Sequence, residues 1–357
     1  MIYASVCSGV EAASLAWIPL GWKAAWFSEI EPFPCAVLKH RFPEVPNLGD
    51  MTKIKVETIE NETGKLQRFT TESGADVVVP GGVDLLVGGT PCQGFSVAGK
   101  QDGLDDPRSA LCLAYCELLE TMRPRWFVWE NVPGVFNTNQ GDDFRAFLRK
   151  IDEVGYSVAW RVLDAQYVRV DGYPRAIPQR RRRVFVVGHF GSDFRCPAEV
   201  LFEPGCLPGD TPSRRVKGAG VARCLTASTG GASGKERQHT FISGDGRPLN
   251  AINVIATGQA NAETVTDLCV NLTCNHEAPI ACGYENHPQD AFVRRLLPVE
   301  CERLMGFPDN WTRIPWNDKP EEECPDSHRY KACGNSMCVN VMRWIGMRIE
   351  LTERKIK

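Results

Sequence analysis

The chain has 357 residues, of which 43% are hydrophobic and 24% charged, and its formal net charge is −3. This composition predicts a globular protein with a sizeable core, and the overall charge gives no indication of a nucleic-acid partner. No window reaches the roughly 18 apolar residues that a membrane helix needs, so we expect no membrane partner.

The 15 cysteines are scattered, and no secretory signal precedes them. We therefore expect reduced thiols and a cytoplasmic protein instead of a disulfide framework. A loose cluster of possible metal ligands lacks the paired Cys-x-x-Cys of a zinc site: Cys269, Cys274, His276 and Cys282. We therefore predict no metal.

Apolar runs alternate with helical patterns over residues 1–190, which predicts an α/β fold with a mixed, mostly parallel sheet and helices on both faces. The clearest helix should begin at Asp106-Pro107, a capping residue followed by proline, and end before Arg123-Pro124. The expected strands are 3–7, 24–29, 84–88, 126–130, 157–163 and 183–188.

Three further segments depart from this alternation. The polar segment 51–82 predicts an inserted hairpin or loop. Residues 191–292 are rich in Gly, Thr, Asn and Ser, and we expect a separate, smaller, loop-rich domain there. Helical patterns return at 298–305 and 339–351, so we expect residues 293–357 to pack back onto the first domain.

Several turns at strand ends could hold a nucleoside. An acidic residue after the second strand of such a fold commonly binds a ribose, and a glycine turn lets a ligand approach the backbone. Neither Gly-x-Gly-x-x-Gly nor Gly-Lys-Ser/Thr occurs, which leaves S-adenosylmethionine as the candidate. A single glycine can also serve the turn alone, and Asn-Ser can be a plain N-cap. The candidate turns are Ser8-Gly9-Val10, Glu29-Ile30, Asp50-Met51 and Asn335-Ser336.

The strongest chemical signal is Pro91-Cys92-Gln93 at the end of an apolar run, followed by Glu130-Asn131-Val132 at the end of another. A thiol nucleophile with a carboxyl proton partner can attack an electron-poor ring such as a pyrimidine. The loop 94–100 could close over a substrate. The alternative interpretations are an inert buried cysteine and an exposed strand-end acid.

A basic run, Arg180 to Arg183, opens the last of these strands. Because side chains alternate along a strand, Arg181 and Arg183 share one face, and Arg180 and Arg182 the other. One pair could point into the site while the other meets phosphate or solvent. A solvated face is the simpler alternative.

Together these segments resemble the DNA (cytosine-5) methyltransferases of bacteria and their viruses, and they cover most of the chain outside 191–292. Two residues depart from the family's cofactor turn, because Cys7 and Glu11 stand where a phenylalanine and a second glycine are usual. The intervals 50–84 and 168–175 are also longer than usual. The matching segments are Ser8-Gly9, Glu29, Gly49-Asp50, 89–96, Glu130-Asn131-Val132, 178–183, 300–308 and 334–336.

The resemblance implies a Rossmann-like methyltransferase that uses S-adenosylmethionine and yields S-adenosylhomocysteine. Cys92 would attack C6 of a flipped-out cytosine, and Glu130 would contact the N3 edge and offer a proton. Arg181 and Arg183 would hold the base. The implied cofactor contacts are Ser8, Gly9, Val10, Glu29, Ile30, Asp50, Met51, Gly89, Pro91, Leu111, Asn335 and Ser336.

The resemblance also implies a partner, double-stranded DNA, contacted by Gln93, Ser96, Arg180 and Arg182. The segment 191–292 would be the target-recognition domain. We expect a monomer in the bacterial cytoplasm or nucleoid, with a role of the restriction-modification type.

Two alternatives stay open. The first is an RNA cytosine-5 methyltransferase of the same fold, although the Cys-Phe-Thr triplet normal in the transfer-RNA enzyme is absent. The second is a DNA-binding relative that has lost catalysis, which predicts a broken Cys, Glu or Arg position. None of these positions is broken in this chain.

Overall fold

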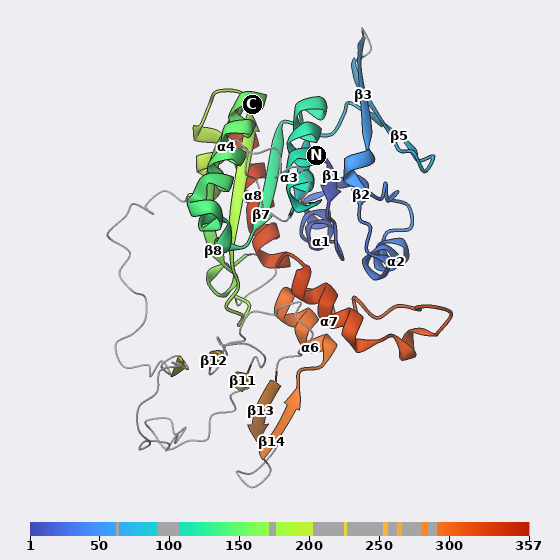
Figure 1. Cartoon of the computed structure of the whole chain (residues 1–357), viewed down its shortest axis with the longest axis vertical. Helices are drawn as coiled ribbons and strands as arrows, with labels where there is room; N and C mark the ends of the chain where they lie inside the picture. Colours follow the sequence, from blue (N-terminus) through green and yellow to red (C-terminus); the bar gives the residue numbers. More distant parts are fainter. Residues whose placement is uncertain are drawn as a thin grey trace.

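The computed structural model describes residues 1–61, 64–90, 107–170, 176–202, 225–226, 253–255, 263–265, 280–284 and 291–356. Its central feature is a six-stranded sheet with the order β2-β1-β6-β7-β9-β8 (Figure 1). The strands are β1 (Ile2–Val6), β2 (Lys23–Ser28), β6 (Leu85–Gly88), β7 (Trp126–Asn131), β8 (Tyr156–Asp164) and β9 (Arg182–Phe190).

Strand direction confirms the mixed, mostly parallel sheet. Strands β2, β1, β6 and β7 pair in parallel, and β9 pairs antiparallel with both β7 and β8. Only β9 therefore runs against the other five. The carboxyl ends of β1, β2, β6 and β7 meet at one edge, where ligands of open α/β sheets bind.

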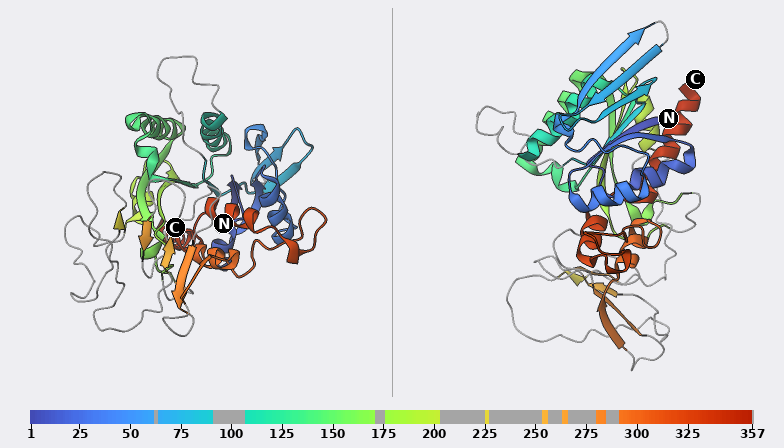
Figure 2. Two further views of the ribbon diagram at one scale, coloured as in Figure 1. Left: turned by 60° about the horizontal axis from the view of Figure 1, so that its bottom comes forward. Right: turned by 90° about the vertical axis from the view of Figure 1, so that its right-hand side faces the viewer.

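Helices cover both faces of the sheet (Figure 2), as the alternating pattern predicts. One face carries α1 (Ala12–Trp17), α5 (Arg195–Leu201) and α8 (Val339–Ile356), and the other carries α3 (Pro107–Met122) and α4 (Asp142–Val154). On β7, Trp126 and Val128 point into the first core, while Phe127 and Trp129 point into the second. This alternation is the period of a strand buried on both sides.

The segment 51–82, expected as a hairpin or loop, contains a three-stranded antiparallel sheet, β3-β4-β5. Its strands are β3 (Lys55–Asn61), β4 (Gly64–Thr70) and β5 (Asp76–Pro80). Buried Gln67 joins it to the main domain, because its amide donates to Met122 O at 2.6 Å and its carbonyl accepts from Val83 N at 2.9 Å. The first of these bonds satisfies a carbonyl at the end of α3.

Helix α5 lies near the start of the predicted segment 191–292 and packs on β8, β9 and α8. The seven residues of α5 are too few to show a periodic pattern in the sequence. The later limit falls inside β14 (Ala291–Arg295). The remaining described strands of this segment are β10 (Leu225–Thr226), β11 (Asn253–Ile255), β12 (Glu263–Val265) and β13 (Ile280–Tyr284).

The end of the chain returns to the sheet. After α6 (Pro298–Met305) and α7 (Asp326–Asn335), α8 packs against α1 and α5 (Figure 1). Trp17 Nε1 donates to Met342 O at 2.8 Å, which fastens α1 to α8. The remaining helix, α2 (Pro32–Arg41), follows β2. Within the described ranges, no helix combines the length and apolarity that crossing a bilayer requires.

Candidate active site

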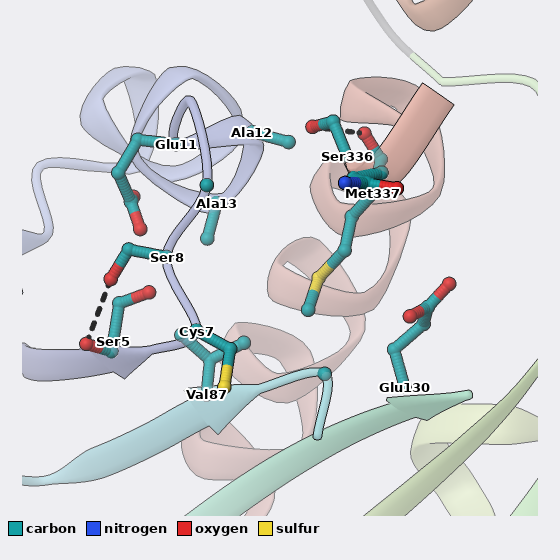
Figure 3. Close-up of a pocket in the computed structure, with 13 residues that line it drawn as sticks. Ser5, Cys7, Ser8, Glu11, Ala12, Ala13, Val87, Glu130, Ser336 and Met337 are labelled. Atoms are coloured by element: carbon teal, nitrogen blue, oxygen red, sulfur yellow. Dashed lines mark hydrogen bonds between the residues drawn. The ribbon is translucent and has the colours of Figure 1, made fainter. Parts of the chain in front are cut away.

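A pocket of about 390 Å³, part of it open to solvent, lies where β1, β6 and β7 end (Figure 3). The start of α1 and the connection between α7 and α8 form its other walls. Six predicted site residues line it: Ser8, Gly9, Gly89, Glu130, Asn335 and Ser336. The fold therefore brings two of the four candidate turns, Ser8-Gly9 and Asn335-Ser336, to one cavity with Gly89 and Glu130.

Backbone groups organise the side of the pocket nearest β1 and β2. Gly9 has a positive φ of 57°, which a glycine adopts without strain, and its N–H donates to Glu29 Oε2 at 2.7 Å. Glu29 Oε1 accepts from the N–H groups of Ile30 and Glu31, each at 2.9 Å. Three of the four lone-pair positions of this carboxylate are thereby used, and one can accept a ligand hydroxyl.

Other predicted cofactor residues are described by the structure but are not among the residues that line this pocket: Val10, Asp50, Met51 and Leu111. The Val10 side chain is buried in the core, and its carbonyl accepts the Trp311 indole N–H at 2.8 Å. Asp50 accepts from Thr52 N at 3.0 Å as the N-cap of a short 3₁₀ turn that begins at Met51. Leu111, on α3, packs at the edge of the second core.

Glu130 and Arg183 form an ion pair on the opposite side of the pocket. Arg183 Nε lies 3.1 Å from Glu130 Oε1, and the two side chains are 13% and 12% exposed. Burial raises the pKa of Glu130, while Arg183 and then Arg181 oppose that shift without cancelling it. The carboxyl therefore keeps its proton to higher pH than an exposed glutamate and can act as a proton donor.

Arg181 holds the turn that forms one wall of the pocket. Its guanidinium is buried, and Nη2 donates to Gly334 O at 3.1 Å and to Ser336 O at 2.5 Å. Burial, and then Arg183, lower the pKa of Arg181 to about 10, so it remains charged at neutral pH. Arg181 thus joins the start of β9 to the turn before α8. Of the predicted outward pair, Arg180 is half-buried and Arg182 is exposed.

The end of β6 is held against β7 directly before the cysteine motif. Asn131 Nδ2 donates to Thr90 O at 2.9 Å, and Thr90 is only 1% exposed. A Cβ atom at Gly89 would lie 3.0 Å from Glu130 Oε2, so glycine permits this close approach. The next residues, which include Pro91, Cys92, Gln93 and Ser96, lie outside the described residues.

Both departures from the family's cofactor turn have left-handed backbones, with φ of 49° at Cys7 and 61° at Glu11. This conformation explains why glycine is usual at the second position. Burial, and then Glu29 and Asp50, raise the pKa of Cys7 to about 12, so its thiol stays protonated. Cys7 is therefore unsuited to be the nucleophile.

Among the pocket residues that had no role assigned from the sequence, Glu11 and Met337 are the most informative. Buried Glu11 caps α1, with Oε2 accepting from Ser14 N at 3.0 Å and from Ser14 Oγ at 2.5 Å. Figure 3 shows the Met337 side chain reaching into the pocket between Cys7 and Glu130. Glu11 could have been suspected because it replaces a glycine, whereas Met337 gave no signal beyond its neighbours Asn335-Ser336.

The chain matches the family model of the C-5 cytosine-specific DNA methylases over residues 1–195 and 230–351. It is 35% identical over 506 aligned positions to a protein of Escherichia phage P1 named "DNA N-6-adenine-methyltransferase", which covers all of this chain and 63% of that protein. It is 34% identical over 190 residues to the orphan methyltransferase M.SPRI of Bacillus phage SPR, covering 52% of this chain and 36% of the relative. The chain thus spans less than two thirds of the length of these relatives.

Solved structures agree on the fold. The Dnmt2 methyltransferase of S. pombe superposes with a TM-score of 0.58 at 15% identity, covering 98% of this chain and 99% of that one. A putative DNA modification methyltransferase of an E. coli prophage has a TM-score of 0.54 at 16% identity, covering 99% of each chain. Since the family model matches most of its length, the chain belongs to the C-5 cytosine-specific DNA methylase family.

Proposed function

We propose that this chain transfers a methyl group from S-adenosylmethionine to C5 of cytosine in double-stranded DNA. The observation that carries the proposal is that Glu130, paired with Arg183, lines the same cavity as the Ser8-Gly9 turn. A buried acid whose pKa is raised suits a ring that gains negative charge when a nucleophile adds to it. The family membership and the neighbouring Pro91-Cys92 motif agree with this chemistry.

The residues at the ends of β1 and β2 fit a nucleoside cofactor. Glu29 offers a fixed carboxylate to ribose hydroxyls, and Ile30, 66% exposed, offers an apolar surface to a base. The turn at Ser8-Gly9 exposes backbone to the cavity. When bound, S-adenosylmethionine supplies the electrophilic methyl group that C5 takes up.

The remaining steps of the proposed reaction take place between the protein's side chains and the target cytosine. Because a cytosine stacked in a duplex is inaccessible to a thiolate, the base must first be flipped out. The Cys92 sulfur forms a bond to C6, and the displaced ring electrons are stabilised by a proton from Glu130 at N3. Arg183 orients this carboxyl. After C5 is methylated, loss of its proton restores the double bond and expels the Cys92 thiolate.

The name of the phage P1 relative raises a second candidate, methylation of the adenine N6 amine. An exocyclic amine is itself the nucleophile in that reaction, so the enzyme needs neither a thiol that adds to the ring nor an acid that protonates a ring nitrogen. The raised pKa of Glu130 beside Arg183 therefore favours cytosine over adenine.

The products of one reaction distinguish these candidates. The full chain would be incubated with methyl-labelled S-adenosylmethionine and either unmethylated plasmid DNA or transfer RNA, and the nucleosides would be separated by mass spectrometry. We expect labelled 5-methylcytosine from DNA alone. Labelled N6-methyladenine in DNA, label in RNA only, or no label in any nucleoside would each contradict the proposal.

We further propose that residues 191–292 select the target sequence, with Gln93, Ser96, Arg180 and Arg182 contacting DNA, and that the enzyme acts as a monomer in the cytoplasm or nucleoid. Exchanging this segment with that of a relative should change which cytosines are methylated, as read by sequencing methylated DNA. An unchanged target would place sequence selection elsewhere in the chain.

A further inference from the structure

Two side chains of β7 hold the same residue at the end of β6. Trp129 Nε1 donates to Thr90 Oγ1 at 2.8 Å, while Asn131 Nδ2 donates to the Thr90 carbonyl at 2.9 Å. Trp129 and Asn131 flank Glu130 and, by strand alternation, lie on the opposite face of the sheet. The hydroxyl and the carbonyl of Thr90 are thus fixed by the immediate neighbours of Glu130.

The Trp129 indole is itself held rigidly. It is fully buried and stacks on Phe147, with ring centroids 4.4 Å apart and an interplanar angle of 28°. Phe144, on the same helix α4, also stacks with the indole, with ring centroids 6.4 Å apart and an interplanar angle of 25°. The direction of the indole N–H is therefore set by α4 packing and not by a mobile rotamer.

Thr90 comes directly before the Pro91-Cys92 motif in the sequence. The chain therefore enters that motif from a residue that Trp129 and Asn131 hold beside Glu130. Gly89 reinforces this placement, because it approaches the Glu130 carboxyl so closely that a Cβ there would lie 3.0 Å from Oε2.

We propose that Trp129 is a positioning residue for methyl transfer, and that its hydrogen bond to the Thr90 hydroxyl holds the end of β6 against Glu130. This inference rests on the proposed function. Small displacements of a reacting group can lower the rate by roughly 100-fold, so losing the bond should act on kcat and not on cofactor binding.

Three substitutions test the bond. Trp129→Phe keeps an aromatic ring packed against α4 but lacks the indole N–H donor. Thr90→Val keeps the shape of the side chain but lacks the hydroxyl acceptor. Each should lower kcat for 5-methylcytosine formation by roughly 10- to 100-fold, with KM for S-adenosylmethionine changed less than about twofold. Thr90→Ser retains the hydroxyl and should stay within about threefold of the unaltered chain. Combining Trp129→Phe with Thr90→Val should lower kcat little more than either change alone, because both remove the same hydrogen bond.

Trp126→Phe is the matched control. Trp126 lies on the same strand, is also fully buried, and donates its indole N–H to Glu353 Oε1 at 2.7 Å, away from the pocket. It should lower the melting temperature but leave kcat unchanged. The proposal is overturned if Trp129→Phe and Thr90→Val keep the kcat of the unaltered chain, if Thr90→Ser is as slow as Thr90→Val, or if Trp126→Phe lowers kcat equally.

The valine and serine variants keep the test valid if Trp129→Phe fails to fold, because they change only one small side chain. Failure of the positioning role is also distinct from failure of the proposed function. In the second case the unaltered chain itself forms no 5-methylcytosine, whereas in the first it does and the substitutions have no specific effect.

Discussion

The two sides of the pocket are built differently. Around Gly9 and Glu29 the contacts are made mostly by backbone N–H groups, whereas around Glu130 they are made by the side chains of β7 and β9. The backbone side accommodates a cysteine at position 7 and a glutamate at position 11 without losing its turn. In the proposed function the side nearest Gly9 would hold the cofactor and the side nearest Glu130 the base. We infer that the turn at Gly9 tolerates substitution at its flanking positions, while the side nearest Glu130 depends on individual chemical groups.

Glu130→Gln should have the largest effect of these substitutions, a loss of kcat. The amide keeps the size of the side chain but cannot supply a proton, so kcat should fall roughly 100- to 10,000-fold. Burial raises the pKa of Glu130 above the ordinary 4.5, and only the protonated acid donates. The pH profile of kcat/KM should therefore lose activity as pH rises through this raised pKa.

The amide variant should lack that part of the profile, since glutamine does not titrate. If the variant keeps both the rate and the pH profile of the unaltered chain, Glu130 is not the acid.

Glu29→Gln should act on the cofactor side and leave the chemistry intact. Losing a charged acceptor for ribose hydroxyls should raise the dissociation constant of S-adenosylmethionine by roughly 10-fold or more, as measured by calorimetry. At saturating cofactor, kcat should change little.

Glu31→Gln serves as the control for Glu29. Glu31 pairs with Lys331 at 2.9 Å on the exposed surface, and such pairs contribute little. Equal loss of affinity in both variants would argue against a specific role for the Glu29 carboxylate.

Glu11→Gln should have the smallest effect, on stability alone. Burial is the main cause that raises the pKa of Glu11 above 4.5. Between 4.5 and the raised folded value, the unfolded chain is ionised while the folded chain is protonated, so unfolding releases a proton and stability falls as pH rises.

The glutamine variant lacks this proton release. Its melting temperature, measured from pH 4 to pH 9, should therefore fall less steeply through that window than the melting temperature of the unaltered chain. Parallel curves for the two proteins would show that Glu11 does not titrate differently on folding.

The predictable parts of the molecule are those that local patterns encode. The six strands and the helix ending before Arg123-Pro124 follow from apolar runs and capping residues, and the structure has them close to the predicted bounds. The third strand of the insertion and the short helix α5 were missed, because β5 is specified by its pairing with β4 and α5 by its packing on β8 and α8.

The candidate site also has a part that local sequence patterns predict and a part that depends on the fold. Motifs contiguous in sequence, such as Ser8-Gly9 and Glu130-Asn131, could be singled out before the fold was known. The bond between Trp129 and Thr90 joins residues 39 positions apart, and it depends on the β6–β7 register and on the packing of α4. Periodicity carries no information about such a contact.

The central claim is that Cys92 forms a covalent bond to the target base, and trapping that bond tests it most directly. DNA containing 5-fluorocytosine should stall the reaction after methyl transfer, because fluorine at C5 cannot leave as a proton does. With S-adenosylmethionine present, we predict a protein–DNA complex that survives denaturation and maps to Cys92 by peptide mass spectrometry. Cys92→Ser should form none while still binding the cofactor. An adduct at another residue, or 5-methylcytosine formation by Cys92→Ser at the normal rate, would contradict the account.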